Sequence, residues 1–175
     1  WFALASVEEA NTALGSENEF TRYTSRVRFY QDLTLDMVLK ANVELGLITS
    51  PSRTGAPIFE RYFVGGPLTV RGFLRNSLGP TISVFDSIRP DRGTVSQNIG
   101  GTEQLLMNLE YEFPIFQTVG IRGVAFADGG NAFNRQDPFA DKLEALRFAW
   151  GFGIRWFSPI GPLRFEWCFP FATTE

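Results

Sequence analysis

Long runs in which apolar and polar side chains strictly alternate constrain the fold of this 175-residue chain more than any other feature. Because successive side chains of an extended strand point to opposite faces, a period of two predicts strands with one apolar face. The clearest runs cover residues 35–47, 103–113, 146–156 and 163–169. Weaker runs cover residues 1–9, 21–30 and 119–128. The pattern predicts an all-β protein with about seven strands.

The composition excludes several classes of protein. No uninterrupted apolar run approaches the roughly 20 residues of a membrane-spanning helix, and a hydrophobic content of 44% argues against disorder. The absence of histidine removes Ser/His and Cys/His nucleophilic sites and most zinc sites. The single cysteine, Cys168, cannot form an intramolecular disulfide. A formal net charge of -3 argues against nucleic acid as a partner.

Strand length and side-chain chemistry favour a transmembrane antiparallel β-barrel over a soluble barrel or sandwich, which remains the alternative. The predicted strands exceed the 5 or 6 residues typical of soluble sheets and match the roughly 9 to 11 residues of a tilted membrane-spanning strand. Their polar faces carry Arg, Lys, Glu and Gly, as a water-filled lumen requires. Short links at 114–118 and 158–162 alternate with long links at 129–143 and 50–100, as in bacterial outer-membrane barrels.

Two of the runs assign faces to individual residues. In the run over 146–156, Arg147, Gly151 and Arg155 are expected to face the lumen. The residues of that run expected to face lipid are Leu146, Phe148, Trp150, Phe152 and Ile154. The last run is expected to form an exposed sheet edge, with apolar residues Leu163, Phe165, Trp167 and Phe169. About seven strands cannot close alone, because bacterial barrels have an even number of at least eight.

The longest link contains Gly65-Gly66-Pro67-Leu68-Thr69-Val70-Arg71-Gly72-Phe73. A guanidinium held inside a barrel stays charged and needs carboxylate or carbonyl partners, which Glu110, Glu112 and Asp128 offer on the lumen faces. Gly72 would permit a close backbone approach, and Phe73 would pack the loop tip against the wall. The alternative is an ordinary exposed turn in which Arg71 is merely solvated.

Four motifs occur in an order that resembles the BamA-like family of outer-membrane β-barrel assembly factors. The segment GGPLTVRGF is similar to the family's loop signature. The segments Asn108–Pro114, Phe126–Gly130 and 156–171 (WFSPIGPLRFEWCFPF) resemble, in turn, the strand after that loop, the Asp-Gly end of the next strand and the penultimate hairpin. The resemblance covers nearly the whole chain.

The resemblance implies that residues 1–175 are the C-terminal portion of a 16-stranded outer-membrane barrel, with a loop over about 50–100 folding inward. Glu110 and Asp128 occupy the positions where the family places loop-anchoring carboxylates. The family's periplasmic POTRA repeats are not present in the chain, and no final strand is expected after Thr173-Thr174-Glu175. The implied localisation is the outer membrane of a Gram-negative-type bacterium.

The implied function is insertion and folding of client β-barrels without enzymatic chemistry, cofactor or metal. The implied partners are outer-membrane lipids, unfolded outer-membrane β-barrel clients and periplasmic assembly lipoproteins that bind through the POTRA repeats, with no nucleic acid. Two alternatives remain: a two-partner secretion pore that passes unfolded polypeptide, and a plain channel barrel. The WFSPIGPLRFEW segment resembles the assembly factors more than the secretion pores.

Other candidate sites have simpler explanations. Residues 128–131 (Asp-Gly-Gly-Asn) lack the spaced ligands and closing Glu of a calcium loop, and a turn is expected there. Glu110 and Glu112 could be interpreted as a glycosidase pair, but lumen-facing charges explain them better. A wet lumen also explains Arg22, Arg26 and Arg28 on one strand face. Cys168 fits the lumen face as a small residue, and the sequence does not decide whether it is native or introduced.

Overall fold

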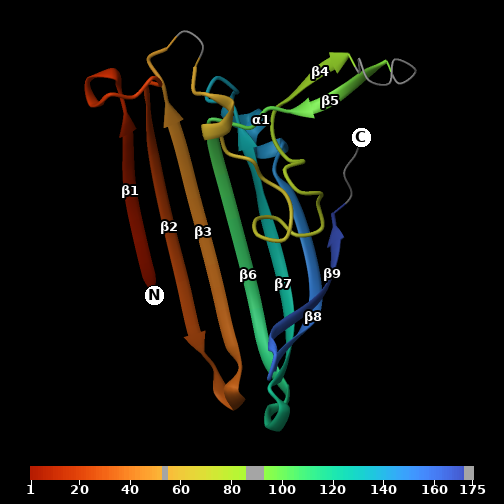
Figure 1. Ribbon diagram of the computed structural model, residues 1–175. Helices are drawn as coiled ribbons and strands as arrows, with labels where there is room; N and C mark the ends of the chain where they lie inside the picture. Colours follow the sequence, from red (N-terminus) through yellow and green to blue (C-terminus); the bar gives the residue numbers. More distant parts are fainter. Residues whose placement is uncertain (53–54, 86–92, 172–175) are drawn as a thin grey trace.

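Seven antiparallel strands form one sheet in the computed structural model, which describes residues 1–52, 55–85 and 93–171 (Figure 1). The strand order is β1-β2-β3-β6-β7-β8-β9, so β1 and β9 are its two edges. The bounds are β1 Phe2–Ala10, β2 Phe20–Asp32, β3 Val38–Thr49, β6 Glu103–Phe116, β7 Ile121–Phe133, β8 Arg147–Ser158 and β9 Gly161–Pro170. The prediction of an all-β antiparallel partial barrel is confirmed.

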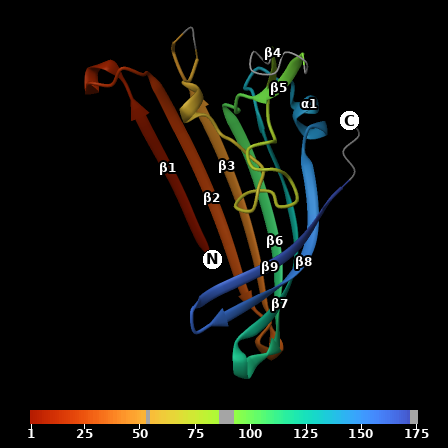
Figure 2. The ribbon, with the colours of Figure 1, turned by 45° about the vertical axis from the view of Figure 1, so that its right-hand side comes forward.

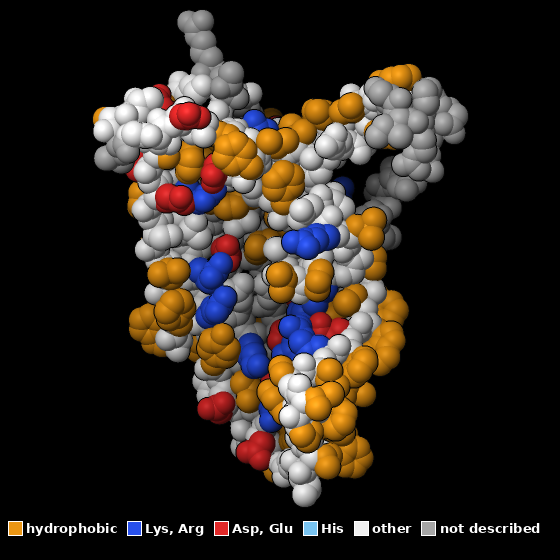
Figure 3. Space-filling model, viewed as in Figure 1, with side chains coloured by type: hydrophobic (Ala, Val, Ile, Leu, Met, Phe, Trp, Pro, Cys, Tyr) orange, Lys and Arg blue, Asp and Glu red, His pale blue; other side chains and the backbone are white. Residues whose placement is uncertain are grey.

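The sheet curls into a trough, with β8 and β9 turning toward the open side (Figure 2). Even-numbered residues face the hollow and odd-numbered residues face outward on every long strand except β8, where the two are exchanged. On β6, for example, Leu106 and Glu112 are buried, whereas Leu109 on the opposite face is exposed. Charged side chains gather in the hollow and hydrophobic side chains toward its margins (Figure 3). This separation is the one expected from a period of two.

The connections differ in length between the two ends of the strands. At one end the strands are joined by tight turns, at 33–37, 117–120 and 159–160. The first two turns contain the short 3-10 helices η2 (Thr34–Asp36) and η5 (Gln117–Val119). At the other end lie η1 (Thr12–Leu14), the link after β3 with η3 (Ile58–Glu60), and α1 (Phe139–Glu144) before β8 (Figure 1). No helix in the described ranges is long and apolar enough to span a membrane.

The longest link leaves β3, enters the hollow and returns to β6. It contains a hairpin of β4 (Thr81–Phe85) and β5 (Thr94–Asn98), which the sequence pattern did not reveal. Of the predicted link over 50–100, residues 53–54 and 86–92 lie outside the described residues, as does the Thr173-Thr174-Glu175 end. Two clusters of buried apolar residues sit where the link meets the wall: Val64, Val70, Leu78, Leu106 and Ala132, and Phe20, Ile48 and Ala56.

Three expected strand starts and ends are wrong. The run over 35–47 begins as a strand only at Val38, because Leu35 adopts a left-handed conformation (φ 63°) in the preceding turn. The expected break at 114–118 starts too early, since β6 continues to Phe116 through an irregularity in pairing after Pro114. Leu146 precedes β8, which begins at Arg147, so Leu146 does not belong to the alternating outward row of that strand.

The largest correction concerns 129–143, which was expected to be a link. Strand β7 continues through Gly129, Gly130 and Asn131 to Phe133 and pairs with the first residues of β6. Glycine is needed at Gly129 because the ring of Phe148 on the neighbouring strand occupies the position of a side chain: a Cβ added at Gly129 would lie 2.6 Å from that ring. Residues 128–131 are therefore strand and not a turn. The turn of the last hairpin is likewise shorter than 158–162, because β8 and β9 pair from Ser158 and Gly161.

Candidate functional site

The link from β3 to β6 forms a compact turn inside the hollow. Tyr62 exchanges backbone hydrogen bonds with Gly101 at its base, at 2.9 Å in both directions, and the Leu78 amide donates to the Val64 carbonyl at 3.0 Å. At the tip the Gly66 amide donates to the Val70 carbonyl at 3.1 Å. Gly65 and Gly66 have φ angles of 108° and 104°, a region that favours glycine. This turn fixes the direction in which Arg71 leaves the loop.

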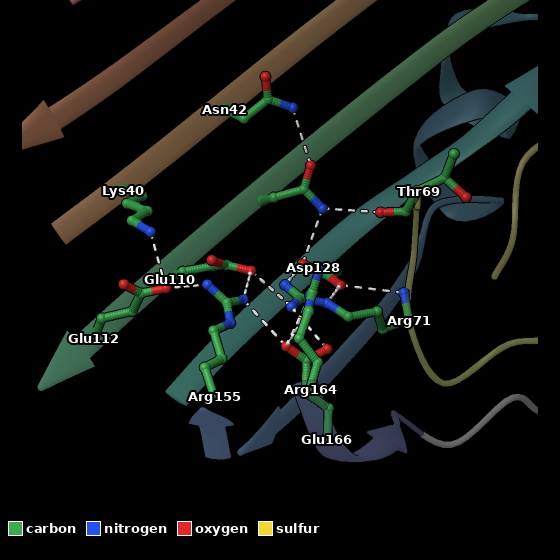
Figure 4. A network of polar contacts seen from close by, with 11 residues as sticks. Lys40, Asn42, Thr69, Arg71, Glu110, Glu112, Asp128, Arg155, Arg164 and Glu166 are labelled. Carbon is green, nitrogen blue, oxygen red and sulfur yellow. Dashed lines mark hydrogen bonds and ion pairs between the residues drawn. The ribbon is translucent and has the colours of Figure 1, made fainter. Parts of the chain in front are cut away.

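Arg71 is the centre of the site and is only 5% exposed (Figure 4). Its Nε donates to Asp128 Oδ2 at 2.6 Å, and its Nη2 donates to Asp128 Oδ1 at 2.8 Å. The Arg71 backbone amide adds a third bond to Asp128 Oδ2 at 3.1 Å. Its Nη1 reaches Glu110 Oε1 at 2.7 Å and Glu166 Oε2 at 3.4 Å. The fork geometry joins the loop to three strands of the wall.

The alternation of side chains along each strand determines which residues of the wall meet Arg71. Asp128 and Phe126 are two residues apart on β7, so both face the hollow. The Arg71 guanidinium carbon lies 3.6 Å from the centre of the Phe126 ring, a cation–π distance. Asn108 on β6 donates from Nδ2 to Asp128 Oδ1 and to the Thr69 carbonyl, each at 2.9 Å. The carboxylate of Asp128 therefore accepts hydrogen bonds from both the loop and the wall.

Gly72 and Phe73 complete the contact of the loop with the wall. Gly72 has a φ of 90°, and a Cβ added there would lie 3.3 Å from the Cβ of Ala149 and 3.4 Å from the Cβ of Cys168. The loop backbone thus lies against β8 and β9 at a distance that a side chain would disturb. Phe73 is partly buried and packs on the apolar cluster that contains Val70 and Leu106.

A second layer of ion pairs continues from the Arg71 site along the wall (Figure 4). Arg155 Nη2 lies 2.9 Å from Glu110 Oε1 and 3.1 Å from Glu166 Oε1, and its Nη1 pairs with Glu112. The outer members are three cations: Lys40 at 2.8 Å and Arg122 at 3.6 Å from Glu112, and Arg164 at 2.8 Å from Glu166. Five cations thus surround four carboxylates, so the cluster is close to charge neutrality.

Arg71 remains protonated in this environment. Burial alone lowers the pKa of its guanidinium, but hydrogen bonding to Asp128 and the charges of Asp128, Glu110 and Glu166 outweigh burial and raise the pKa above its usual value. The positive charge that holds the loop tip is therefore independent of pH over the physiological range. No group of three or more His, Cys, Asp or Glu side chains suited to a metal ion occurs in the described part of the chain.

A second anchor holds the start of the loop. Arg22 on β2 donates from Nη2 to the Glu60 carbonyl at 2.7 Å and to Glu60 Oε2 at 2.5 Å, and from Nη1 to Glu8 on β1 at 2.8 Å. The loop is thus held to β2 at its start, where Arg22 also binds β1, and to β6, β7 and β9 at its tip. The two anchors span the width of the sheet.

The structure brings together Arg71, Glu110 and Asp128, and it places Gly72 and Phe73 in the same contact. Glu112 lies in the second layer and does not contact Arg71. Sequence reasoning did not find Asn108, Glu166 or the anchor formed by Arg22 and Glu60. Asn108 and Glu166 lie on the even-numbered, lumen-facing sides of β6 and β9, so the alternation of side chains could have identified them as candidates. No local signal pairs Arg22 with Glu60.

Phe148, Trp150, Phe152 and Ile154 lie on the outer face of β8 and are exposed, whereas Leu146 is partly buried ahead of the strand. Gly151 and Arg155 lie on the inner face. Arg147 donates to the carbonyls of Glu144 and Leu146 at the end of the strand. The outward residues Leu163, Phe165, Trp167 and Phe169 belong to β9, which pairs only with β8 in the sheet.

Comparison with known proteins gives a consistent result. The family model described as the Omp85 superfamily domain matches residues 1–175. The chain is 27% identical over 157 residues to the outer membrane protein assembly factor BamA of Nitratidesulfovibrio vulgaris, covering 90% of this chain and 18% of that protein. It is 24% identical over 182 residues to the BamA of Neisseria meningitidis serogroup B, covering 89% of this chain and 22% of that protein.

Among solved structures, the chain is similar to BamA from Haemophilus ducreyi lacking POTRA domains 1-3. The TM-score is 0.80 at 23% identity, and the match covers 98% of this chain and 35% of the solved chain. At that identity the likeness concerns the fold. The chain spans less than a quarter of the length of the two curated relatives.

Proposed function

The chain belongs to the Omp85 superfamily, and from this membership we infer that residues 1–175 are the C-terminal part of the barrel of an outer-membrane protein assembly factor. The protein is an outer-membrane β-barrel protein of a Gram-negative-type bacterium. In the proposed function it inserts and folds client β-barrel proteins in the outer membrane and carries out no enzymatic chemistry. The names of the two curated relatives support this assignment.

The proposed mechanism uses strand edges in place of a reactive group. An edge strand presents unpaired N–H and C=O groups, and hydrocarbon makes such groups costly. A client strand that pairs with an edge of the whole barrel satisfies its own backbone and that of the edge at the same time, which is recognition by strand addition. The substrate is then an unfolded polypeptide, and no cofactor takes part.

The observation that carries the proposal is the buried contact of Arg71 with Asp128. Burying a charge pair is costly unless the geometry is well matched and further hydrogen bonds satisfy the remaining groups, as they do here. Such a contact holds the loop in one position inside the wall. A loop held in one position inside the barrel suits a protein that must open between its first and last strands while the rest of the wall keeps its shape.

The proposed partners follow from the same assignment. Outer-membrane lipids contact the outward apolar residues, and unfolded β-barrel clients engage a strand edge. Periplasmic assembly lipoproteins bind POTRA repeats, which form no part of residues 1–175. We expect that further strands of the whole barrel pair with β1 and β9.

The test is replacement of the cell's assembly factor by full-length protein carrying Arg71→Ala, with Arg75→Ala as the matched control. Arg75 lies on the same loop, is exposed and forms no ion pair with the described residues. We expect the Arg71 variant to lower the amount of folded, heat-modifiable client barrel in the outer membrane several-fold, and the control to leave it unchanged. Normal client assembly by the Arg71 variant would contradict the proposed role of the loop. Release of an unfolded partner protein without client assembly would indicate a secretion pore instead.

A further inference from the structure

A polar cavity of about 390 Å³ lies in the hollow, next to the tip of the long loop. Residues 67–69 of the loop form one wall, and side chains of β2, β3, β6 and β9 form the others. Lysine and arginine side chains stand on both sides of the hollow (Figure 3). The charged residues that line the cavity are one carboxylate, Glu110, and four cations, Arg28, Lys40, Arg71 and Arg164. Such a lining attracts anions.

A chain of hydrogen bonds crosses the wall and begins at Arg28. Strand pairing places Arg28, Asn42, Asn108 and Asp128 in one inward row across β2, β3, β6 and β7. Asn108 donates to Asp128 at 2.9 Å, and Asn42 donates to Asn108 at 3.0 Å (Figure 4). Arg28 Nε donates to Asn42 Oδ1 at 3.4 Å.

The two ends of this row fix its direction. A carboxylate only accepts hydrogen bonds and a guanidinium only donates them, so each amide between Asp128 and Arg28 turns its NH₂ group toward Asp128. The long bond from Nε is the single hydrogen bond of Arg28 within the described part of the chain. Its two Nη atoms therefore remain as donors for another acceptor at the cavity.

Arg28 differs from the other three cations in having no carboxylate partner among the described residues. The other three pair with carboxylates of the wall. With Arg28, the five cations and four carboxylates of the wall cluster become six and four, an excess of two positive charges. Asp32, two residues further along the inward face of β2, lines a different cavity between the turns. An anion in the polar cavity would balance this excess.

We propose that the polar cavity binds a phosphate group, either of a phosphate monoester or of free phosphate. Phosphate carries about 1.5–2 negative charges at pH 7, which matches the excess. Its oxygens point in several directions, so it can accept hydrogen bonds from Arg28 on β2, Lys40 on β3 and Arg164 on β9 together. A planar carboxylate accepts mainly from donors near its own plane.

The inference depends on the water-filled lumen of an outer-membrane barrel and not on the assembly activity. Phosphate reaches such a site from the aqueous phase, and its binding is measured without any client protein. The inference therefore fails or survives separately from the proposed function.

The test is equilibrium dialysis of the full-length protein, in phosphate-free detergent buffer, against radiolabelled inorganic phosphate or glycerol 3-phosphate. We expect one phosphate group per wild-type molecule. Arg28→Gln should weaken binding roughly tenfold or more, because it removes charge-assisted hydrogen bonds. Arg28→Lys should recover part of the affinity, since it keeps the charge and loses the fork. Arg135→Gln is the matched control, because it removes the same charge from an exposed arginine that follows β7 and does not line the cavity.

Arg28→Gln should fold, because Arg28 is partly exposed and gives up a single long hydrogen bond. Heat-modifiable migration on gels verifies this for each variant. Arg164→Gln removes a donor from the opposite side of the cavity and should also lower the affinity. Tighter binding of glycerol 3-phosphate would identify a monoester as the ligand, and tighter binding of inorganic phosphate would identify free phosphate.

Three results would overturn the inference. An equal loss of affinity in Arg135→Gln would show that binding follows net charge and not this cavity. Competition by acetate at the same concentration as phosphate would overturn the assigned ligand. Absence of phosphate binding by the folded wild-type protein would mean that Arg28 is already neutralised in the whole barrel.

Discussion

Asp128 Oδ2 accepts hydrogen bonds from both the side-chain Nε and the backbone amide of Arg71, at 2.6 and 3.1 Å. One carboxylate oxygen thus fixes the position of the loop backbone and the direction of the guanidinium together. The loop and the wall meet at a defined geometry and not through charge attraction alone.

Arg71→Ala is expected to lower the free energy of unfolding by about 3–5 kcal/mol, because it leaves Asp128 buried and unpaired. Arg71→Lys should recover only part of this loss, since an ammonium cannot form the two parallel bonds to Asp128. Equilibrium unfolding in urea, with the full-length protein in lipid vesicles, measures both changes. Arg75→Ala serves as the control and should change the stability by less than about 0.5 kcal/mol. Equal effects at the two positions would refute the anchoring role.

Gly72→Ala is expected to destabilise the loop more than Gly15→Ala does. Both glycines have positive φ angles, 90° and 81°, so both variants incur backbone strain of about 1–3 kcal/mol. Only at Gly72 would the new Cβ also press on Ala149 and Cys168, whereas nothing lies within 4 Å of a Cβ at Gly15. Limited proteolysis of the loop and urea unfolding should separate the two variants. Indistinguishable behaviour would mean that the close approach of loop and wall has no energetic consequence.

Arg22→Ala is expected to loosen the start of the loop and the edge strand β1, with a cost of about 1–3 kcal/mol. Because Arg22 and Arg71 share no partner, the double variant with Arg71→Ala should show nearly additive losses. Hydrogen exchange of β1 and of the segment around Glu60 provides the local measurement. Strong non-additivity would show that the two anchors act as one unit.

Trp150→Arg is expected to cost about 2–4 kcal/mol if Trp150 lies near the bilayer midplane. Ile160→Arg, in the exposed turn between β8 and β9, should cost no more than about 1 kcal/mol. Spin labels at Phe148, Trp150, Phe152 and Ile154 should all be broadened by a lipid-soluble relaxation agent, and a label at Ile160 by a water-soluble one. Water accessibility at all of these positions would argue against a membrane-facing surface on β8.

Residues 1–175 expressed alone are not expected to form a closed monomer. The sheet ends at β1 and β9, and unpaired backbone groups along both edges favour association with further strands. Size-exclusion chromatography with light scattering in detergent should reveal oligomers or aggregates. A monodisperse, heat-resistant monomer would contradict the partial-barrel interpretation.

The sequence by itself determined the all-β class and the face of most strand residues, because a period of two assigns alternate side chains to opposite faces whatever the neighbours are. Because a guanidinium inside a barrel needs carboxylate partners, it also offered Glu110, Glu112 and Asp128 as partners of Arg71, and the family resemblance indicated Glu110 and Asp128 among them. It did not determine where strands end. Gly129 and Gly130 look like a turn in the chain, but the partner strands β6 and β8 hold them extended.

Only the tertiary structure decided which strands pair, and therefore which charges meet. Glu166 and Asn108 join the Arg71 site because β9 curls over and β6 lies beside β7, and Arg22 meets Glu60 across a separation of 38 residues. The outward row of Ala5, Ser25 and Leu45 also depends on register, since these residues become neighbours only through the pairing of three strands. Side-chain periodicity is a local property of an extended chain, whereas register and curvature are fixed by contacts between residues far apart in the sequence.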